Sequence, residues 1–232
     1  MENVIYDNRR DINKILKVVD KPPQYTKPTL SISISPSTIE HNKSTNVTIS
    51  ANFNKNDGGP VKSYTIKKGN EIIFSNSIIT NYTESINVSH GTTTTYTGIV
   101  EYDNGVIKTS TMGVEYPAGQ IKAGSISANN SVKAYALSYY GVISGSTITN
   151  VSALSSRLST SKSFTTTFTL KNQRVVYMYP KSFGTLTSIK DANNFDYISS
   201  YTLSSMNYNN VDYYVYILTD PVTITDFKQV FN

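Results

Sequence analysis

Apolar and polar residues alternate along most of residues 29–116, which is the pattern of half-buried β-strands. Residues 47–53 are a clear example, because every second side chain there is apolar. Turn sequences separate such runs, among them Gly69-Asn70 and Asn104-Gly105. The Asn-Gly pair predicts a hairpin in which Val106–Tyr116 returns beside the preceding strand.

The alternating runs amount to seven short strands with turns at the spacing of a sandwich. They predict an immunoglobulin-like β-sandwich over residues 28–117. The chain has no Cys and no Trp, so the disulfide-bonded variety of that fold is excluded.

Residues 1–27 have a different pattern, which predicts a short helical arm followed by a linker. Four apolar residues share one face of this helix, basic residues occupy the other side, and Pro22-Pro23 ends it. A helix this short is not stable alone. It either packs against its own domains or docks into a neighbour, and the stiff proline linker favours docking. The side chains expected to dock are Ile5, Ile12, Leu16 and Val19.

A change in composition at Pro117-Ala118-Gly119 predicts a boundary, followed by a second β-sandwich over residues 118–232. Within it, Leu186 and Ile189 are three residues apart, which predicts one helical turn over Thr185–Asp191. The expected fold is therefore mainly β, with two β-sandwich domains and a short N-terminal helical arm.

The strongest strand signal is Val211–Leu218, which is apolar or aromatic on both of its alternating faces. Such a strand is central in a sandwich or has one face against a partner. Asn209-Asn210 tolerates positive φ, so Ser205–Tyr208 is expected to pair with it as a hairpin. Pro180 has no backbone donor, so the strand Arg174–Tyr179 is expected to end there.

Composition narrows the function classes. Only 16% of the 232 residues are charged, and the chain has no cysteine, so a disulfide framework and a thiolate metal site are excluded. No basic start is followed by an apolar core, so no secretion signal is expected. No run of about 18 apolar residues occurs either, so no membrane span is expected.

Charge is segregated along the chain. No Asp or Glu occurs from Tyr116 to Lys190, where eight basic residues lie, and five Asp follow in the tail. One hypothesis is a basic face made by Lys171, Arg174 and Lys181, and the alternative is that these charges are scattered over the sandwich. No nucleic-acid motif accompanies them, so nucleic acid is not an expected partner.

Signals for catalysis are weak. His41 and His90 lie in polar, turn-like surroundings without the spacing of metal ligands. Glu101 and Asp103 are paired acids, but glycosidic chemistry needs a second acid across a cleft. The chain has no nucleophile elbow and no phosphate loop. We therefore expect no catalysis, no metal and no cofactor.

Four segments of the C-terminal half occur in a distinctive order: Tyr179–Gly184, Leu186–Asp191, Val211–Leu218 and Ile224–Phe231. In that order they resemble the C-terminal β module of structural proteins in tailed bacteriophages of the crAss-like, Bacteroidetes-infecting type, which often follows an immunoglobulin-like domain. The resemblance covers roughly Ile121–Asn232 and brings no catalytic motif.

The resemblance implies a non-enzymatic virion component, made in the host cytoplasm and placed in the tail, the connector or collar ring, or on the capsid surface. Its implied partners are other virion proteins and further copies of itself in a ring. The alternative is a carbohydrate-binding or receptor-binding β protein of a tail fibre or adhesin. A hydrolase with an unrecognised site is the third reading.

Overall fold

The computed structural model describes residues 20–232, so the predicted arm with Ile5, Ile12, Leu16 and Val19 lies outside the described residues. Among these described residues, strands hold 57% and helical turns 6%, and none of their helices has seven or more residues. The prediction of a mainly β chain built as β-sandwich domains is confirmed.

The chain forms two compact units. The first holds the residues before Ser37 together with Val47–Glu84 and Thr94–Val132. The second holds Ser37–Asn46, Ser85–Thr93 and Lys133–Asn232. The boundary expected from composition, at residues 117–119, falls inside the first unit, where Pro117–Gly119 forms a single 3-10 turn.

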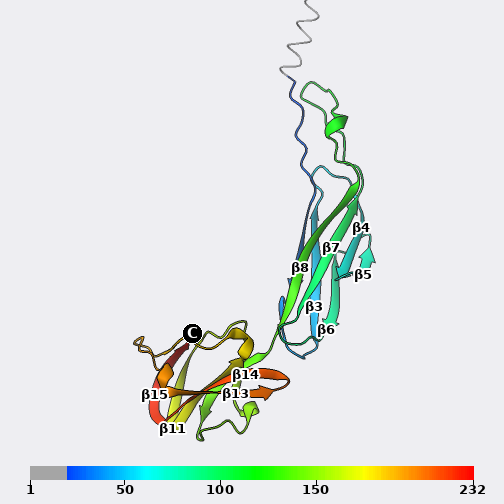
Figure 1. The fold of residues 1–232 in the computed structure, drawn as a ribbon. Helices are drawn as coiled ribbons and strands as arrows, with labels where there is room; N and C mark the ends of the chain where they lie inside the picture. Colours follow the sequence, from blue (N-terminus) through cyan, green and yellow to red (C-terminus); the bar gives the residue numbers. More distant parts are fainter. Residues whose placement is uncertain (1–19) are drawn as a thin grey trace, which may run out of the picture. The chain divides into compact units, whose positions relative to one another are not determined.

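Two sheets build the first unit (Figure 1). One has the order β1-β3-β6, and the other contains β8-β7-β4-β5. The side chain of Ile32 on β1 lies against Gly98 on β7, so closely that a Cβ on that glycine would meet Ile32 Cδ1 at 3.2 Å. The strands are β1 (Thr29–Ser35), β3 (Thr45–Asn54), β4 (Val61–Lys68), β5 (Glu71–Asn76), β6 (Asn81–Ile86), β7 (Thr93–Tyr102) and β8 (Gly124–Tyr135).

Of the two hairpin turns predicted in this unit, one is confirmed and the other is wrong. Gly69-Asn70 joins β4 to β5 as expected, with Lys68 paired to Glu71. The hairpin at Asn104-Gly105 is wrong, because β7 ends at Tyr102 and its neighbour in the sheet is β8, which starts at Gly124.

The physical reason is the use that the structure makes of Gly105. Its N–H donates to the carbonyl of Ile121, and a Cβ on it would lie 1.8 Å from the carbonyl oxygen of Asp57. The glycine therefore allows two backbones to approach rather than closing a two-residue turn. Residues 103–123 form an excursion between β7 and β8.

The excursion is tied to the chain before β1 by polar contacts. The Tyr25 hydroxyl donates to the Tyr116 carbonyl at 2.9 Å and accepts from the Lys108 N–H at 2.7 Å. Lys108 Nζ also lies 2.7 Å from Asp57 Oδ2, and this partner lowers the pKa of the Asp57 carboxyl. The stretch around Tyr25, predicted as part of a linker, is thus bound to its own unit.

The second unit contains a sheet in the order β10-β9-β11-β14-β13 (Figure 1). The first half of its long strand β11 pairs instead with β15, which also pairs with β12. The strands are β2 (Thr38–Glu40), β9 (Leu137–Ile143), β10 (Ser155–Leu158), β11 (Phe164–Pro180), β12 (Ile189–Lys190), β13 (Tyr201–Tyr208), β14 (Val211–Leu218) and β15 (Val222–Phe231).

Strand β14 is covered on both faces, which confirms the interpretation of its sequence as a central strand. Tyr216 and Leu218 belong to a cluster with Tyr177, Tyr179 and Phe231. The alternate residues of β14 pack on the other face of the sheet in a second, mainly aliphatic cluster that also contains Tyr139. These alternate residues are Val211, Tyr213, Val215 and Ile217.

Asn209-Asn210 forms the predicted tight turn, with φ of 50° and 61°, and β11 ends at Pro180 as predicted. The helical turn predicted over Thr185–Asp191 is wrong. Ile189 lies in β12 opposite Phe231, and burial of its side chain on the aromatic cluster keeps the backbone extended. The 3-10 turn forms earlier, at Lys181–Phe183.

Candidate interaction surface of the second unit

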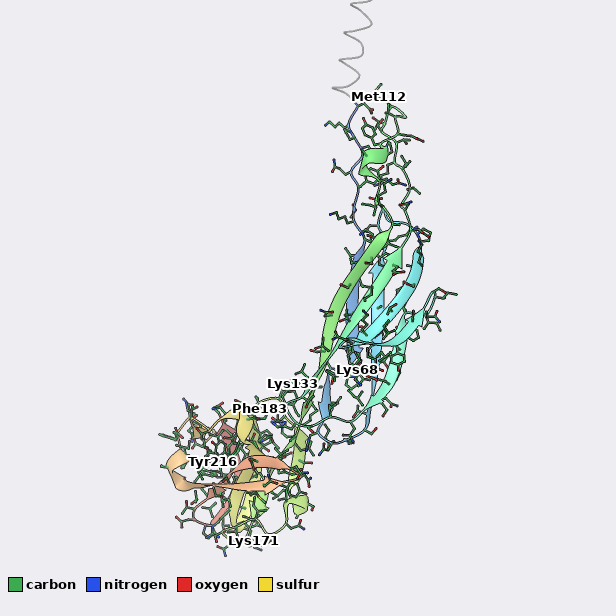
Figure 2. All side chains as sticks on the ribbon, turned by 45° about the vertical axis from the view of Figure 1, so that its right-hand side comes forward. Lys68, Met112, Lys133, Lys171, Phe183 and Tyr216 are labelled. Carbon is green, nitrogen blue, oxygen red and sulfur yellow. The ribbon has the colours of Figure 1, made fainter. Side chains whose placement is uncertain are left out.

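The three residues of the predicted basic face lie along β11 and just beyond it, and they do not converge. Figure 2 labels Lys171 at one side of the second unit and Phe183, two residues after Lys181, at the other. Lys171 and Lys181 are ten positions apart, which spans roughly 30 Å when the chain is extended. Arg174 donates to the carbonyls of Ser144 and Thr219, each at 3.0 Å.

The structure instead brings together His41 and His90, a contact that the sequence analysis did not predict. The His90 N–H donates to His41 Nδ1 at 2.8 Å. A ring nitrogen that accepts has no proton, so the His41 proton lies on Nε2 and is donated to the Asn209 carbonyl at 3.0 Å. The two residues are 49 positions apart, so no local sequence signal indicates their contact.

His90 is held in the same way. Its Nδ1 accepts from the Ala136 N–H at 2.9 Å, so its Nε2 donates to Ser182 Oγ at 2.8 Å. Burial lowers the pKa of His90, and the neighbouring positive charge of Lys133 lowers it further. The ring meets Phe183 edge-on, with centroids 6.1 Å apart.

Both imidazoles therefore act as structural acceptors for backbone donors, with both ring nitrogens of each engaged. Beside them lies a pocket of about 390 Å³ lined by Lys181, Ser182 and Asp212 as well. Among residues 20–232, no group of three or more His, Cys, Asp or Glu side chains is placed to hold one metal ion.

The carboxylates of Glu101 and Asp103, considered above as paired acids, make structural bonds, and so does that of Asp196. Glu101 accepts from Ser63 Oγ at 3.2 Å, and Asp103 forms an ion pair with Lys62 at 2.9 Å. Asp196 Oδ1 accepts two backbone N–H groups, which lower the pKa of its carboxyl.

The most unusual surface is the free edge of β13. Its pairing with β14 across the two-residue turn places Tyr208 opposite Val211. In such a hairpin the residues next to the turn are hydrogen-bonded to each other, and the bonding alternates along the strand. The N–H and C=O groups of Leu203, Ser205 and Asn207 therefore point away from β14. Among the described residues, no backbone hydrogen bond outside the strands uses them.

Other sheet edges have features that discourage pairing with a foreign strand. Strands β2, β10 and β12 are short, and five of the edge strands contain a charge. Strand β1 is uncharged, but the Ile32 carbonyl accepts from Asn130 Nδ2 at 3.0 Å. Strand β13 has eight residues and contains no charge, no proline and no register shift. The charged residues of the other edges are Glu40, Glu71, Glu84, Arg157 and Lys190.

A groove of about 500 Å³ lies beside β13. Ile148, Val215 and Ile217 give it an apolar lining, and serine and threonine hydroxyls with Arg174 give it polar groups. Leu203, on the same strand, is 45% exposed although it is aliphatic. Backbone groups, hydroxyls and apolar area are thus available together along one strand, which suits an extended peptide chain.

Comparison of the chain with family models, with curated proteins and with solved structures found no match in any of the three. In the described part of the chain, no helix combines the length and the apolar character that crossing a membrane requires.

Proposed function

We propose that this protein is a non-enzymatic structural component of a bacteriophage virion that binds other virion proteins through the edge of β13. The observation that carries the binding proposal is that this edge belongs to an uncharged strand of eight residues, and that no other described backbone bonds its outward groups at Leu203, Ser205 and Asn207. Its place in a virion rests on the C-terminal sequence resemblance, which points to the tail, the connector or collar ring, or the capsid surface.

Sheet edges are strongly adhesive because their backbone groups are already aligned for another strand. Proteins that must stay apart place a lysine, a proline or a bulge there. Leu203, Ser205 and Asn207 offer three N–H and three C=O groups without any such obstacle. The ionisable groups that catalysis would need make structural bonds instead, as His41, His90 and Asp196 illustrate.

The hydroxyl-rich groove favours one second candidate, a carbohydrate-binding or receptor-binding protein of a tail fibre or adhesin. Thr202, Ser204 and Thr219 line the groove together with Arg174, and hydroxyl and guanidinium groups are suitable hydrogen-bond partners for sugars. The lining contains no aromatic ring on which a sugar could stack. A glycan array with the purified chain tests this candidate directly.

The test of the main proposal is incorporation into particles. In phage particles that encode the chain, mass spectrometry is expected to find the unmodified protein. Ser205→Lys adds a charge to the free edge and is expected to reduce incorporation at least tenfold while leaving the fold intact. Ser33→Lys is the matched control, because it makes the same change at an exposed position of the covered edge strand β1.

Absence of the unmodified protein from particles would overturn the virion assignment. Normal incorporation of Ser205→Lys would show that the edge of β13 is not the binding surface. Circular dichroism and thermal melting of both variants establish that an altered incorporation is not caused by unfolding.

A further inference from the structure

We infer that the partner of the β13 edge is the β13 edge of a second copy of this chain, paired antiparallel with Ser205 on the two-fold axis. This inference rests on the proposed function, because it names the partner of the same surface. It also goes beyond it by fixing the register of the contact.

The register follows from which residues of β13 have backbone N–H and C=O groups that point away from β14. Tyr201 has the same phase as Leu203, Ser205 and Asn207, but its N–H already donates to the Ile198 carbonyl. The residues with both outward groups free are therefore Leu203, Ser205 and Asn207, which are spaced symmetrically about Ser205. In an antiparallel pair, hydrogen-bonded residues stand directly opposite each other and exchange two bonds. With Ser205 opposite Ser205 of the second copy, Leu203 stands opposite Asn207 twice. Three bonded pairs then use every outward group of these residues.

Side chains in this register are compatible. None of residues 201–208 is charged, so no like charges meet across the two-fold axis. Met206 of the second copy stands opposite Ser204, and Tyr208 of the second copy opposite Thr202. Ser204 and Thr202 both line the groove beside β13. The larger side chains of one copy therefore lie next to the small side chains and the apolar lining of the other.

The lack of charge also favours a second copy over an unrelated strand. A different partner is usually selected by complementary charges near the contact, and β13 offers none. A two-fold contact needs only a surface that complements itself. The symmetry of the outward groups about Ser205 supplies that property.

The absence of cysteine from the chain makes the register directly measurable. Ser205→Cys in the full chain places two thiols on opposed Cα atoms about 5.5 Å apart, within disulfide range. Ser204→Cys is the matched control on the next residue. Its two Cα atoms lie about 8 Å apart in this register, and its side chain is on the other face of the sheet. Under mild oxidation, Ser205→Cys is expected to form disulfide-linked dimers at least tenfold faster than Ser204→Cys.

A second experiment tests the pairing away from the axis. Leu203→Cys and Asn207→Cys chains, one of them tagged, are oxidised separately and as a mixture. The mixed dimer is expected to form at least tenfold faster than either homodimer, because residue 203 stands opposite 207 and not opposite itself. Equal rates for Ser204→Cys and Ser205→Cys, or no preference for the mixed dimer, would overturn the register.

The outcomes separate the two proposals. If Ser205→Lys is lost from particles but Ser205→Cys forms no dimer in solution or in particles, the edge binds a different strand and the second copy is excluded. If Ser205→Cys forms dimers while the chain is absent from particles, self-pairing stands and the virion assignment fails. Circular dichroism of each cysteine variant confirms that the chain is folded before oxidation.

Discussion

The two units bury their strands in different ways. In the first unit, β3 and β7 alternate between buried and more exposed residues, so one face of each strand contributes to the core. In the second unit, the six residues from Val175 to Pro180 at the end of β11 are all buried, and β14 is nearly as enclosed. Central strands buried in this way leave the edge strand β13 and the groove beside it as the places to meet a partner.

Aromatic rings mark the same difference. Tyr177, Tyr179, Tyr216 and Phe231 form one cluster in the second unit, with the Tyr177 and Phe231 centroids 4.5 Å apart. Burial raises the pKa of the Tyr177 hydroxyl to about 12. The first unit has a mostly aliphatic core that includes Val47, Ile49 and Ile66, with a close backbone approach and polar links at its excursion. Stability is therefore expected to respond to different kinds of substitution in the two units.

The largest expected effect is the loss of a ring from the aromatic cluster. Phe231→Ala removes a side chain with no exposed area, and the second unit is expected to lose about 3–5 kcal/mol of unfolding free energy. Phe74→Ala is the control in the first unit, where a half-buried ring contacts Tyr82, and about 1 kcal/mol is expected. Urea unfolding followed by circular dichroism measures both, and equal losses would contradict the comparison.

The features that the sequence predicted correctly are local. The burial of both faces of Val211–Leu218 can be predicted from the apolar residues of that segment alone. The turn at Asn209-Asn210 likewise depends only on those two residues. The failures depend on contacts between distant segments. The partner of Gly105 is Asp57, and nothing near Gly105 indicates that approach.

The candidate surface was harder to predict for the same reason. The sequence indicates that β13 pairs with β14, but whether β13 is an edge depends on the order of the whole sheet. Likewise, the contact between His41 and His90 needs both loops in place. The three residues of the predicted basic face stay apart because an extended strand such as β11 converts separation along the chain directly into distance.

The second expected effect tests whether the close approach of Gly105 to the Asp57 backbone stabilises the first unit. Gly105→Ala places a Cβ against the Asp57 carbonyl, so one of the two segments must move, and a loss of about 2–3 kcal/mol is expected. Gly69→Ala is the control, because its φ is +59° and no atom lies within 4 Å of the added Cβ. Its cost is the left-handed backbone alone, about 1 kcal/mol. A larger loss for Gly69→Ala in urea unfolding would show that the approach is unimportant.

The third expected effect is a pH dependence confined to the second unit. The pKa of His90 is lower in the folded chain than its ordinary value of 6.5, so just below pH 6.5 the unfolded chain binds more protons. The stabilisation from the neutral ring is therefore complete above pH 6.5 and is lost as the pH falls.

His90→Asn tests this directly. Its side-chain oxygen can accept from the Ala136 N–H in place of Nδ1 but does not titrate. Between pH 7 and pH 5, the unmodified second unit is expected to lose stability in urea unfolding, and His90→Asn to lose less. Identical slopes for the two proteins would assign the pH dependence to other groups.

The smallest expected effect compares one hydroxyl in each unit. Tyr201→Phe leaves the buried Gln229 Oε1 without its donor at 3.0 Å, which is expected to cost about 1–3 kcal/mol. Tyr25→Phe removes the hydroxyl that joins Tyr116 to Lys108, but Tyr25 is only half-buried. Water can replace its bonds, so a loss of about 0.5–1 kcal/mol is expected.

The two tyrosine variants are also expected to differ in where the loss appears. Hydrogen exchange of Tyr25→Phe is expected to speed up at the Lys108 amide, which loses its acceptor, and to stay unchanged in β11. For Tyr201→Phe, exchange is expected to speed up throughout β11, β14 and β15, because these strands share one aromatic cluster. If Tyr25→Phe destabilised its whole unit as much as Tyr201→Phe does, the excursion would belong to the core of the first unit, and the contrast between the units would fail.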